Sequence, residues 1–213
     1  MMKTRLLFLL ALMIILPMTI RAAHEIDRTQ TDDDMCPALV ETALNAVDEF
    51  CADTGRNQAC YGNFNLEAEA QPTAEDFTFS EIGDIVNVSD IASLHLAGMD
   101  EASGEWGVAL LRLQTNLPDT LPGQNVTFIL FGDVEVVNAV ETGDVESGEA
   151  TPMQAFYLST GLGDSQCSEA PDSGMIVQTP DGVGEVAFTV NEVDVQMGST
   201  VLFQAVPDDD MDY

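Results

Sequence analysis

The stretch Trp106–Val137 most constrains what this chain can fold into, because it holds two short apolar runs, Val108–Leu113 and Val126–Phe131. The linker between them contains the turn-forming residues Pro118, Asp119, Pro122 and Gly123. Apolar runs of this length, bounded by Pro and Gly, are typical of buried strands rather than of helices. We therefore interpret the runs as two central strands of a β-sandwich, with water excluded from both sides of Leu111 and Ile129.

Alternating apolar and polar residues predict further strands. Val186–Val190 and Val193–Met197 alternate in this way, and Asn191-Glu192 between them predicts a tight hairpin turn. Gly198-Ser199 predicts a second turn into an apolar segment, Val201–Val206. Shorter alternations precede the central pair, around Phe64 and Leu66 and around Phe77 and Phe79, and are interpreted as edge strands and connections. The predicted fold class is all-β, an antiparallel sandwich or a jelly-roll-like domain.

Pro37–Cys51 carries the one clear helical pattern of the chain. Its apolar residues recur at spacings of three and four, as on one face of a helix: Leu39, Ala43, Val47 and Phe50. Pro37 suits the first position of a helix, where its missing N–H is not needed. We expect this amphipathic helix to pack across a sheet or at one end of the sandwich.

The four cysteines, Cys36, Cys51, Cys60 and Cys167, fit two disulfides. A straight helix from 36 to 51 spans about 22 Å, whereas a disulfide requires Cα atoms roughly 6 Å apart, so Cys36 should not pair with Cys51. We favour Cys51–Cys60, which leaves Cys36–Cys167. Cys36–Cys60 with Cys51–Cys167 stays open. A zinc site would lack both CxxC spacing and histidine partners.

Residues 1–22 have the pattern of a secretory signal peptide, with Lys3 and Arg5 before an apolar run and small residues at the expected cleavage site, Ala22. An uncleaved anchor is the alternative. Residues 23–35 then read as an acidic linker, 36–206 as the β-sandwich domain with a possible sub-boundary at 141–152, and 207–213 as an acidic tail. We expect a secreted or cell-envelope protein, without a membrane span after cleavage, in a compartment that permits disulfides.

The charge balance narrows the choice of partners. The chain has 37 Asp and Glu against 6 Lys and Arg, a formal net charge of −31. Cleavage after Ala22 would leave three arginines against the same acids, a charge of −34. Nucleic acid and anionic membranes are excluded as partners, because binding to phosphates requires cations that displace counterions.

Two acidic runs are candidate weak calcium sites: Asp32, Asp33 and Asp34, and Asp208, Asp209 and Asp210. Neither has the alternating spacing and the glycine of an EF-hand loop, and solvated tails are the simpler interpretation. No cofactor is predicted.

Three residues within the predicted strands raise specific expectations. Arg112 interrupts an apolar run, and a cation in a buried strand requires a partner. We expect an ion pair with Asp133 or Glu135. Trp106 is interpreted as a core residue rather than as an exposed platform for a sugar. His95 is interpreted as a structural or surface residue, because the sequence contains no GxSxG, HExxH or P-loop motif that would give it a catalytic setting.

Three segments resemble a group of uncharacterised secreted bacterial proteins, often from filamentous Chloroflexota-type genomes: Arg56–Asn63, Trp106–Val136 and Asp172–Ala205. This resemblance implies no activity. The last segment also looks like the β repeats of FecR-type periplasmic sensor domains over about thirty residues, which would imply a signalling role.

We expect a secreted or surface-displayed, non-catalytic interaction or structural module that binds an unknown protein or glycan at the cell surface. One alternative is a FecR-like extracytoplasmic sensing domain. The other is a glycan-active enzyme based on two carboxylates, which a chain with this many acids does not rule out.

Overall fold

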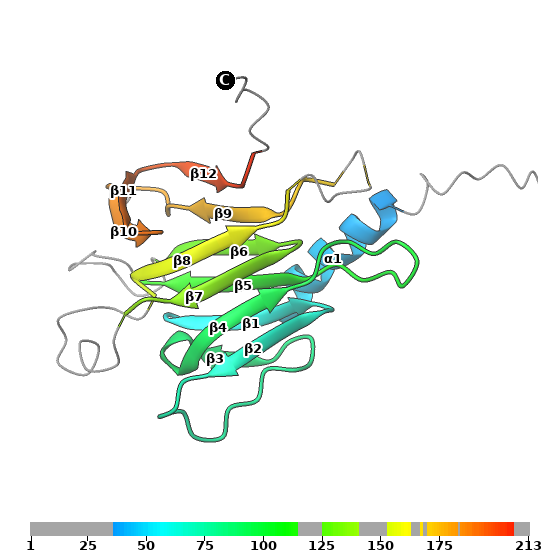
Figure 1. Ribbon diagram of the computed structural model, residues 1–213, viewed down its shortest axis with the longest axis horizontal. Helices are drawn as coiled ribbons and strands as arrows, with labels where there is room; N and C mark the ends of the chain where they lie inside the picture. The colour runs from blue at the N-terminus through cyan, green and yellow to red at the C-terminus, as the bar shows by residue number, and fades with distance from the viewer. Residues whose placement is uncertain are drawn as a thin grey trace, which may run out of the picture. The chain divides into compact units, whose positions relative to one another are not determined.

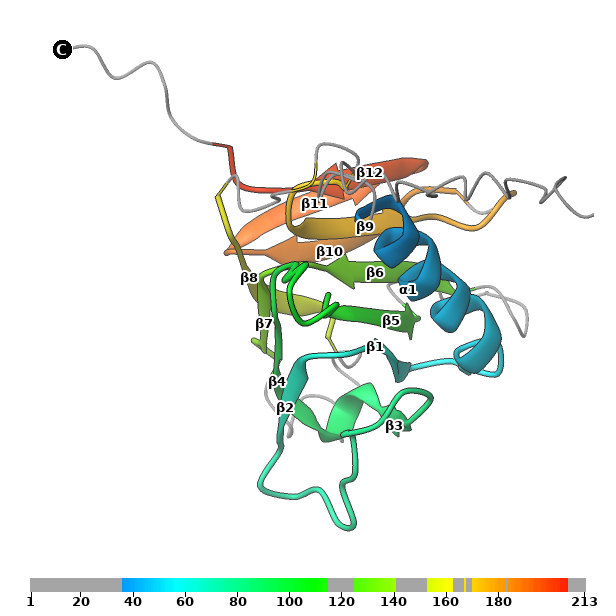
Figure 2. The same cartoon turned by 90° about the vertical axis from the view of Figure 1, so that its right-hand side faces the viewer.

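The computed structural model describes residues 36–114, 125–140, 153–162, 167, 170–182 and 184–206. Their strands form two six-stranded sheets, and a single helix lies against the first sheet (Figures 1 and 2). The predicted all-β class with one N-terminal helix is confirmed. The predicted signal peptide, the acidic linker, both acidic runs and the tail lie outside the described residues.

The first sheet has the strand order β12-β9-β6-β5-β1-β3, and all of its pairings are antiparallel. Its strands are β1 (Gln58–Asn63), β3 (Ile85–Asn87), β5 (Val108–Leu113), β6 (Val126–Phe131), β9 (Gly174–Gln178) and β12 (Thr200–Phe203). The two apolar runs are therefore β5 and β6, which lie side by side at the centre of this sheet. Leu111 is buried in the sandwich interior, and Ile129 packs on the opposite face, toward the helix.

The second sheet has the order β11-β10-β8-β7-β4-β2 and is antiparallel except between β8 and β10. Its strands are β2 (Leu66–Ala70), β4 (Ile91–Leu96), β7 (Val134–Asn138), β8 (Ala155–Thr160), β10 (Val186–Val190) and β11 (Val193–Met197). A short 3-10 turn, η2 (Val88–Asp90), connects β3 to β4. Since β7 pairs directly with β8, the possible sub-boundary at 141–152 falls between neighbouring strands of one sheet.

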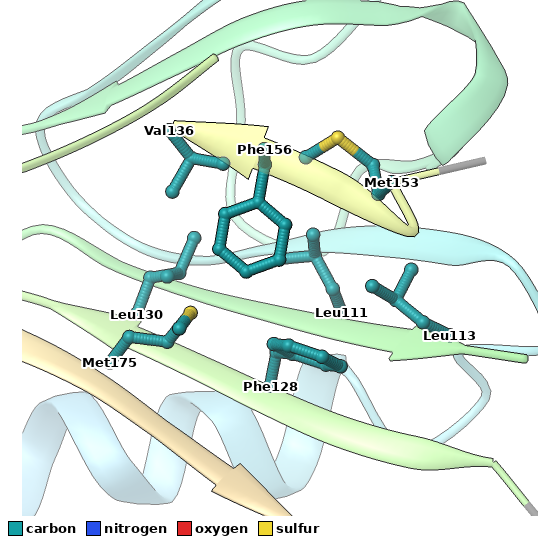
Figure 3. Close-up of a pocket in the computed structure, with 8 residues that line it drawn as sticks. All are labelled: Leu111, Leu113, Phe128, Leu130, Val136, Met153, Phe156 and Met175. Carbon is teal, nitrogen blue, oxygen red and sulfur yellow. The ribbon is translucent and has the colours of Figure 1, made fainter. Parts of the chain in front are cut away.

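The interior between the sheets is filled by side chains from both. Phe128 of the first sheet meets Phe156 and Phe188 of the second, with ring centroids 6.0 and 5.5 Å apart. The void at the centre measures about 10 Å³, and Figure 3 shows the apolar side chains around it. A space of that size holds at most one water molecule, so this void is too small for a ligand.

Helix α1 (Cys36–Phe50) covers part of the outer face of the first sheet (Figure 2). Its buried residues Ala43 and Val47 pack against β1, β5 and the end of β6. A Cβ at Gly62 would lie 2.7 Å from a methyl carbon of Val47, so glycine in β1 permits this close approach. Trp106 is 3 % exposed and lies against Phe131, which confirms the core interpretation and excludes the exposed sugar platform.

The structure specifies two expectations about strands that the sequence left open. The segment after Gly198-Ser199 forms a strand, β12, as predicted; the partner that the sequence left unassigned is β9 in the first sheet and not the neighbour in sequence, β11. Phe77 and Phe79 lie in an irregular connection, one of the two forms expected of the short alternations. Phe79 is nevertheless buried against Tyr61, so apolar alternation there reports core contacts and not strand geometry.

The favoured disulfide is present: Cys51 and Cys60 are bonded, with Cα atoms 5.7 Å apart. Cys167 is buried and disulfide-bonded as well, and the described part of the chain contains no free cysteine. The side chain of Cys36, its predicted partner, lies outside the described residues. Within the described ranges, no helix has the length and apolar character needed to cross a membrane.

Candidate functional site

The outer face of the first sheet divides into two rows of side chains that run across its strands. One row is apolar, and its members pair in register: Ile85, Cys60, Leu110, Ile129, Ile176 and Leu202. Helix α1 packs over its central part. This row explains why the sheet has apolar residues on both faces, as expected of strands covered on both sides.

The second row lies two residues along each strand and is polar on all six strands. Its members also pair in register: Asn87, Gln58, Arg112, Thr127, Gln178 and Thr200. We call this set the polar row. Because successive residues of a strand alternate between faces, these six side chains belong to the same outer face as the apolar row. They are half-buried or exposed.

A groove of about 320 Å³ lies at the centre of the polar row. Its described lining consists of Arg112, Asn125, Thr127, Gln178 and Pro180. Four of these five residues carry hydrogen-bonding side chains, and the described lining contains no carboxylate. The volume falls at the lower end of the range of small-molecule sites, and this groove is the candidate functional site.

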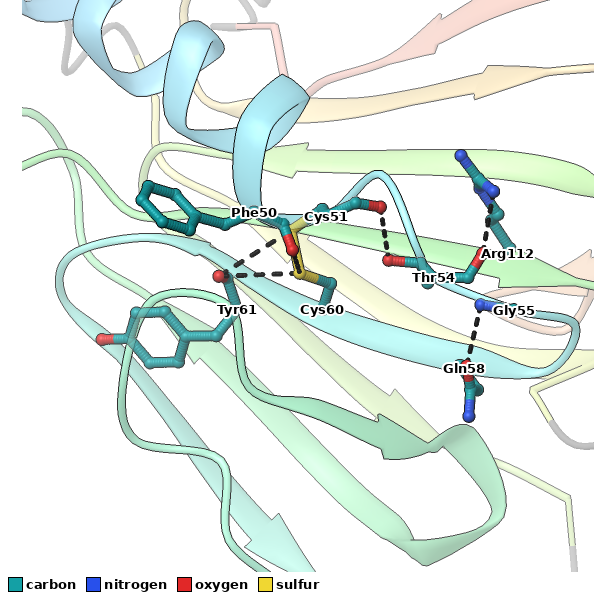
Figure 4. Close-up of a disulfide and its surroundings, with 8 residues drawn as sticks. All are labelled: Phe50, Cys51, Thr54, Gly55, Gln58, Cys60, Tyr61 and Arg112. Carbon is teal, nitrogen blue, oxygen red and sulfur yellow. Dashed lines mark hydrogen bonds between the residues drawn. A yellow bond between two sulfur atoms is a disulfide. The ribbon is translucent and has the colours of Figure 1, made fainter.

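The loop closed by the Cys51–Cys60 disulfide positions the guanidinium of Arg112 (Figure 4). Arg112 Nη1 donates to the carbonyl oxygen of Thr54 at 2.8 Å. Thr54 is 2 % exposed, and its hydroxyl donates to the carbonyl oxygen of Cys51, also at 2.8 Å. The disulfide thus holds the loop that supplies the acceptor for Arg112.

Asn57 connects the same loop to the chain at Arg112 and at Gln114, just after β5. Its backbone N–H donates to the carbonyl oxygen of Arg112 at 2.7 Å, and its Oδ1 accepts from the N–H of Gln114 at 2.8 Å. Asn57 has a φ of 54°, a left-handed conformation that asparagine adopts more readily than most residues. The backbone around Arg112 is therefore held by the loop as well as by the sheet.

Two buried oxygen atoms near this end of the sheet have no hydrogen-bond partner among the residues that the structure describes: Asn125 Oδ1 and Thr179 Oγ1. Asn125 lines the groove, and Thr179 lies between two lining residues, Gln178 and Pro180. Leaving a buried polar atom unpaired costs about 1–3 kcal/mol. Such atoms at a groove mark a place where a ligand with donor groups would gain more than on an ordinary surface.

The positive charge of the described chain is also concentrated here. Arg56 and Arg112 are the only arginines or lysines among the described residues. Arg56 Nη1 donates to Oε1 of Gln114, which follows β5 directly, at 3.0 Å. In a chain with a formal charge of −31, both cations therefore lie at one end of the first sheet.

The predicted ion pair of Arg112 with Asp133 or Glu135 is wrong. Arg112 is beside Thr127 in the ladder, whereas Asp133 follows Phe131, which is beside Val108 at the other end of β5. Glu135 lies on β7 in the second sheet, where it accepts a hydrogen bond from Ser159. The expectation that this cation has a partner holds, but the partner is a backbone carbonyl.

His95 is exposed on the outer face of the second sheet, between Glu67 and Glu135 in the strand register. Its interpretation as a surface residue is confirmed. In the described ranges, no cluster of His, Cys, Asp or Glu side chains has the arrangement of a metal site. The candidate calcium runs, Asp32–Asp34 and Asp208–Asp210, lie outside those ranges.

The sequence argument missed Asn125, Thr127 and Gln178 as site residues. They lie at the same end of the first sheet, at the start of β6 and at the end of β9, and this proximity appears only when the register of β5, β6 and β9 is known. Comparisons with protein-family models, with curated proteins and with solved structures found no match.

Proposed function

We propose that the protein is a secreted, non-catalytic binding module whose ligand occupies the groove beside Arg112. The observation that carries this proposal is the groove itself: hydrogen-bonding side chains and one unpaired acceptor, Asn125 Oδ1, gathered on one sheet face, at the only cations of the described chain. The solid interior supports a site on the outer surface, because the central void has room for no more than a water molecule.

The location outside the cytoplasm is part of the proposal. It is supported by the Cys51–Cys60 disulfide, since structural disulfides persist in oxidising compartments. It is supported further by the signal-like pattern of residues 1–22. N-terminal sequencing of the protein recovered from the medium or envelope of a bacterial host should give His24 or Ala23 as the first residue, and a chain that retains Met1 in the cytoplasm contradicts this part.

The non-catalytic character is supported by the composition of the groove. A glycan-active enzyme of the kind considered above requires two carboxylates on either side of the bond to be cleaved. The described lining of the groove has amide, hydroxyl and guanidinium groups instead. These groups hold a ligand through hydrogen bonds and supply neither a nucleophile nor a general acid at neutral pH.

A direct test is a screen of the purified, oxidised protein against an array of glycans and cell-envelope polysaccharides. The variant Thr127→Trp fills the groove at a strand position that tolerates an aromatic residue. Thr189→Trp is the matched control, because Thr189 is also a half-buried outward-facing strand residue but lies on the second sheet.

We expect Thr127→Trp to reduce binding at least tenfold, whereas Thr189→Trp leaves it within about twofold. Mass spectrometry should show that bound glycans are recovered intact. The absence of any ligand that depends on Thr127 contradicts the binding groove, and a shortened or modified glycan contradicts the non-catalytic character.

A further inference from the structure

We infer that the groove binds a sugar that carries a single carboxylate, with the carboxylate at Arg112 and the sugar hydroxyls at Asn125, Thr127 and Gln178. This inference rests on the proposed function and specifies its ligand. It depends on the chemistry of the groove, on its dimensions and on the charge of the whole chain.

Arg112 is the group that selects a carboxylate. Its Nη1 is held by the carbonyl oxygen of Thr54, and the side chain makes no other hydrogen bond or ion pair with the described residues. A guanidinium has five N–H donors in a planar fork that matches a carboxylate. The side chain is half-buried, so a bound carboxylate would be partly shielded from water. This shielding strengthens the charge-assisted hydrogen bond between the two groups.

Asn125 is the group that selects a hydroxyl-rich ligand. Its Oδ1 is buried and receives no hydrogen bond from the described residues, and a deprotonated carboxylate or phosphate oxygen has no proton to donate to it. A sugar hydroxyl both donates and accepts, so it pairs with Asn125 Oδ1, with the amide of Gln178 and with the hydroxyl of Thr127. Pro180 is the only apolar residue of the described lining, which makes the groove a poor site for apolar peptide side chains.

The dimensions fit one or two sugar rings. Arg112, Thr127 and Gln178 stand on three neighbouring strands in register. Neighbouring strands are 4.7–4.9 Å apart, so the three side chains span about 10 Å. This span, with a groove volume of about 320 Å³, corresponds to a disaccharide or to the end of a longer glycan chain.

The charge of the chain limits the ligand to one negative charge in the groove. At a formal charge of −31, the protein repels polyanions over distances comparable to the Debye length. Arg112 and Arg56 offset this field only at one end of the first sheet. A single carboxylate at that end is attracted, whereas a sulfated or phosphorylated polymer is repelled along the rest of the surface.

The test compares disaccharides that differ only in the carboxylate. The glucuronate-terminated disaccharide glucuronosyl-β-1,4-glucose and the neutral glucosyl-β-1,4-glucose are titrated to millimolar concentration, followed by ¹⁵N NMR of the intact oxidised protein. Galacturonate-terminated and galactose-terminated disaccharides form the second pair. The backbone amides of Thr127 and Gln178 report whether the ligand lies in the groove.

We expect the uronate member of at least one pair to bind tenfold or more tightly than its neutral counterpart. Arg112→Gln should abolish this preference. Arg56→Gln is the matched control: it removes the same charge outside the groove lining and should retain most of the preference. If Arg112→Gln does not fold, Gln178→Glu keeps the side-chain size, places a negative charge in the groove and should also abolish the preference.

Equal binding of both members, insensitive to Arg112→Gln, overturns the carboxylate assignment but leaves the binding module intact. No shift at Thr127 or Gln178 with either pair overturns the sugar assignment. The proposed function is then judged separately by the glycan and polysaccharide screen with Thr127→Trp.

Discussion

The guanidinium of Arg112 is stable within an apolar strand because it lies in the polar row, which is not part of the cluster that packs against helix α1. A fully buried cation would require a carboxylate partner to offset its desolvation. A half-buried cation loses less hydration and requires a weaker partner. The carbonyl oxygen of Thr54 is sufficient for Arg112, whose side chain is partly exposed to solvent. The same partial exposure leaves it accessible to a ligand.

The first prediction concerns this hydrogen bond. Arg112→Met should lower the free energy of unfolding by about 1–2 kcal/mol, because the carbonyl oxygen of the buried residue Thr54 loses its charged donor. Arg56→Met removes an exposed hydrogen bond and should change stability by less than about 0.5 kcal/mol. Urea unfolding of both variants gives the comparison, and equal effects would contradict the positional role of Thr54.

The second prediction concerns Tyr157, whose hydroxyl donates to Oε1 of Glu192 at 3.2 Å on the exposed face of the second sheet. The hydrogen bond to this carboxylate, together with its negative charge, raises the pKa of Tyr157 above the ordinary value. Because the folded state favours the protonated phenol, the stabilisation is present below the ordinary pKa and is lost as the pH rises through the folded one.

Glu192→Gln should therefore lower the pKa of Tyr157, and Glu185→Gln, which changes an exposed acid elsewhere, should not. An NMR titration of the Tyr157 ring between neutral and strongly alkaline pH measures both. A Tyr157 that titrates identically in all three proteins would contradict the contact with Glu192.

At the scale of elements, the hairpin β10–β11 has a two-residue turn whose residues have different roles. Asn191 and Glu192 both have positive φ, 50° and 65°, as a tight two-residue hairpin turn requires. The side chain of Asn191 also pairs with β8: its Oδ1 accepts from Leu158 N at 2.8 Å and its Nδ2 donates to Leu158 O at 3.0 Å. It thereby extends the short parallel contact between β8 and β10.

The third prediction follows from this division. Glu192→Gly should raise the free energy of unfolding by up to about 0.5–1 kcal/mol, because glycine adopts positive φ without strain and the hydrogen bond lost with Tyr157 is exposed. Asn191→Gly should lower it by about 1–2 kcal/mol, because two hydrogen bonds to Leu158 are lost. Thermal unfolding of the two variants under one condition measures both changes in stability. Changes of the same sign would contradict the different roles of Asn191 and Glu192.

The same hairpin shows what sequence patterns reveal and what they do not. Period-two alternation located β10 and β11, because burial on alternate faces leaves a local signature, and short apolar runs bounded by Pro and Gly located the central strands. It did not reveal that β12 crosses to the first sheet, since Val201 and Phe203 face the interior equally well from either layer. The candidate groove depends on the register of three strands, and register is a non-local property. The partner of Arg112 was missed because backbone carbonyls carry no sequence signal.

At the scale of the whole molecule, the distribution of charge is the most unusual property. The acids outnumber the bases by 31, and the sequence pI is about 4.1. Self-repulsion of this kind destabilises the compact state, because unfolding separates the charges. The well-packed core and the disulfide must offset this repulsion, and added salt should weaken it.

The last prediction separates this general repulsion from specific calcium binding by the two acidic runs. Raising NaCl from 0.01 to 0.1 M shortens the Debye length from about 30 to about 10 Å and should raise the unfolding temperature by several degrees. At matched ionic strength, CaCl₂ should raise the unfolding temperature further only if oxygen ligands converge on the Ca²⁺ ion. Replacing Asp208, Asp209 and Asp210 by Asn should then remove the extra increment, as should the same change at Asp32, Asp33 and Asp34.

The control replaces the exposed acids Glu67, Glu69 and Glu75 by Gln, an equal change in charge away from both runs. If all three variants respond to calcium alike, the acidic runs act only as solvated charge, and an unfolding temperature that does not rise with NaCl contradicts the repulsion argument.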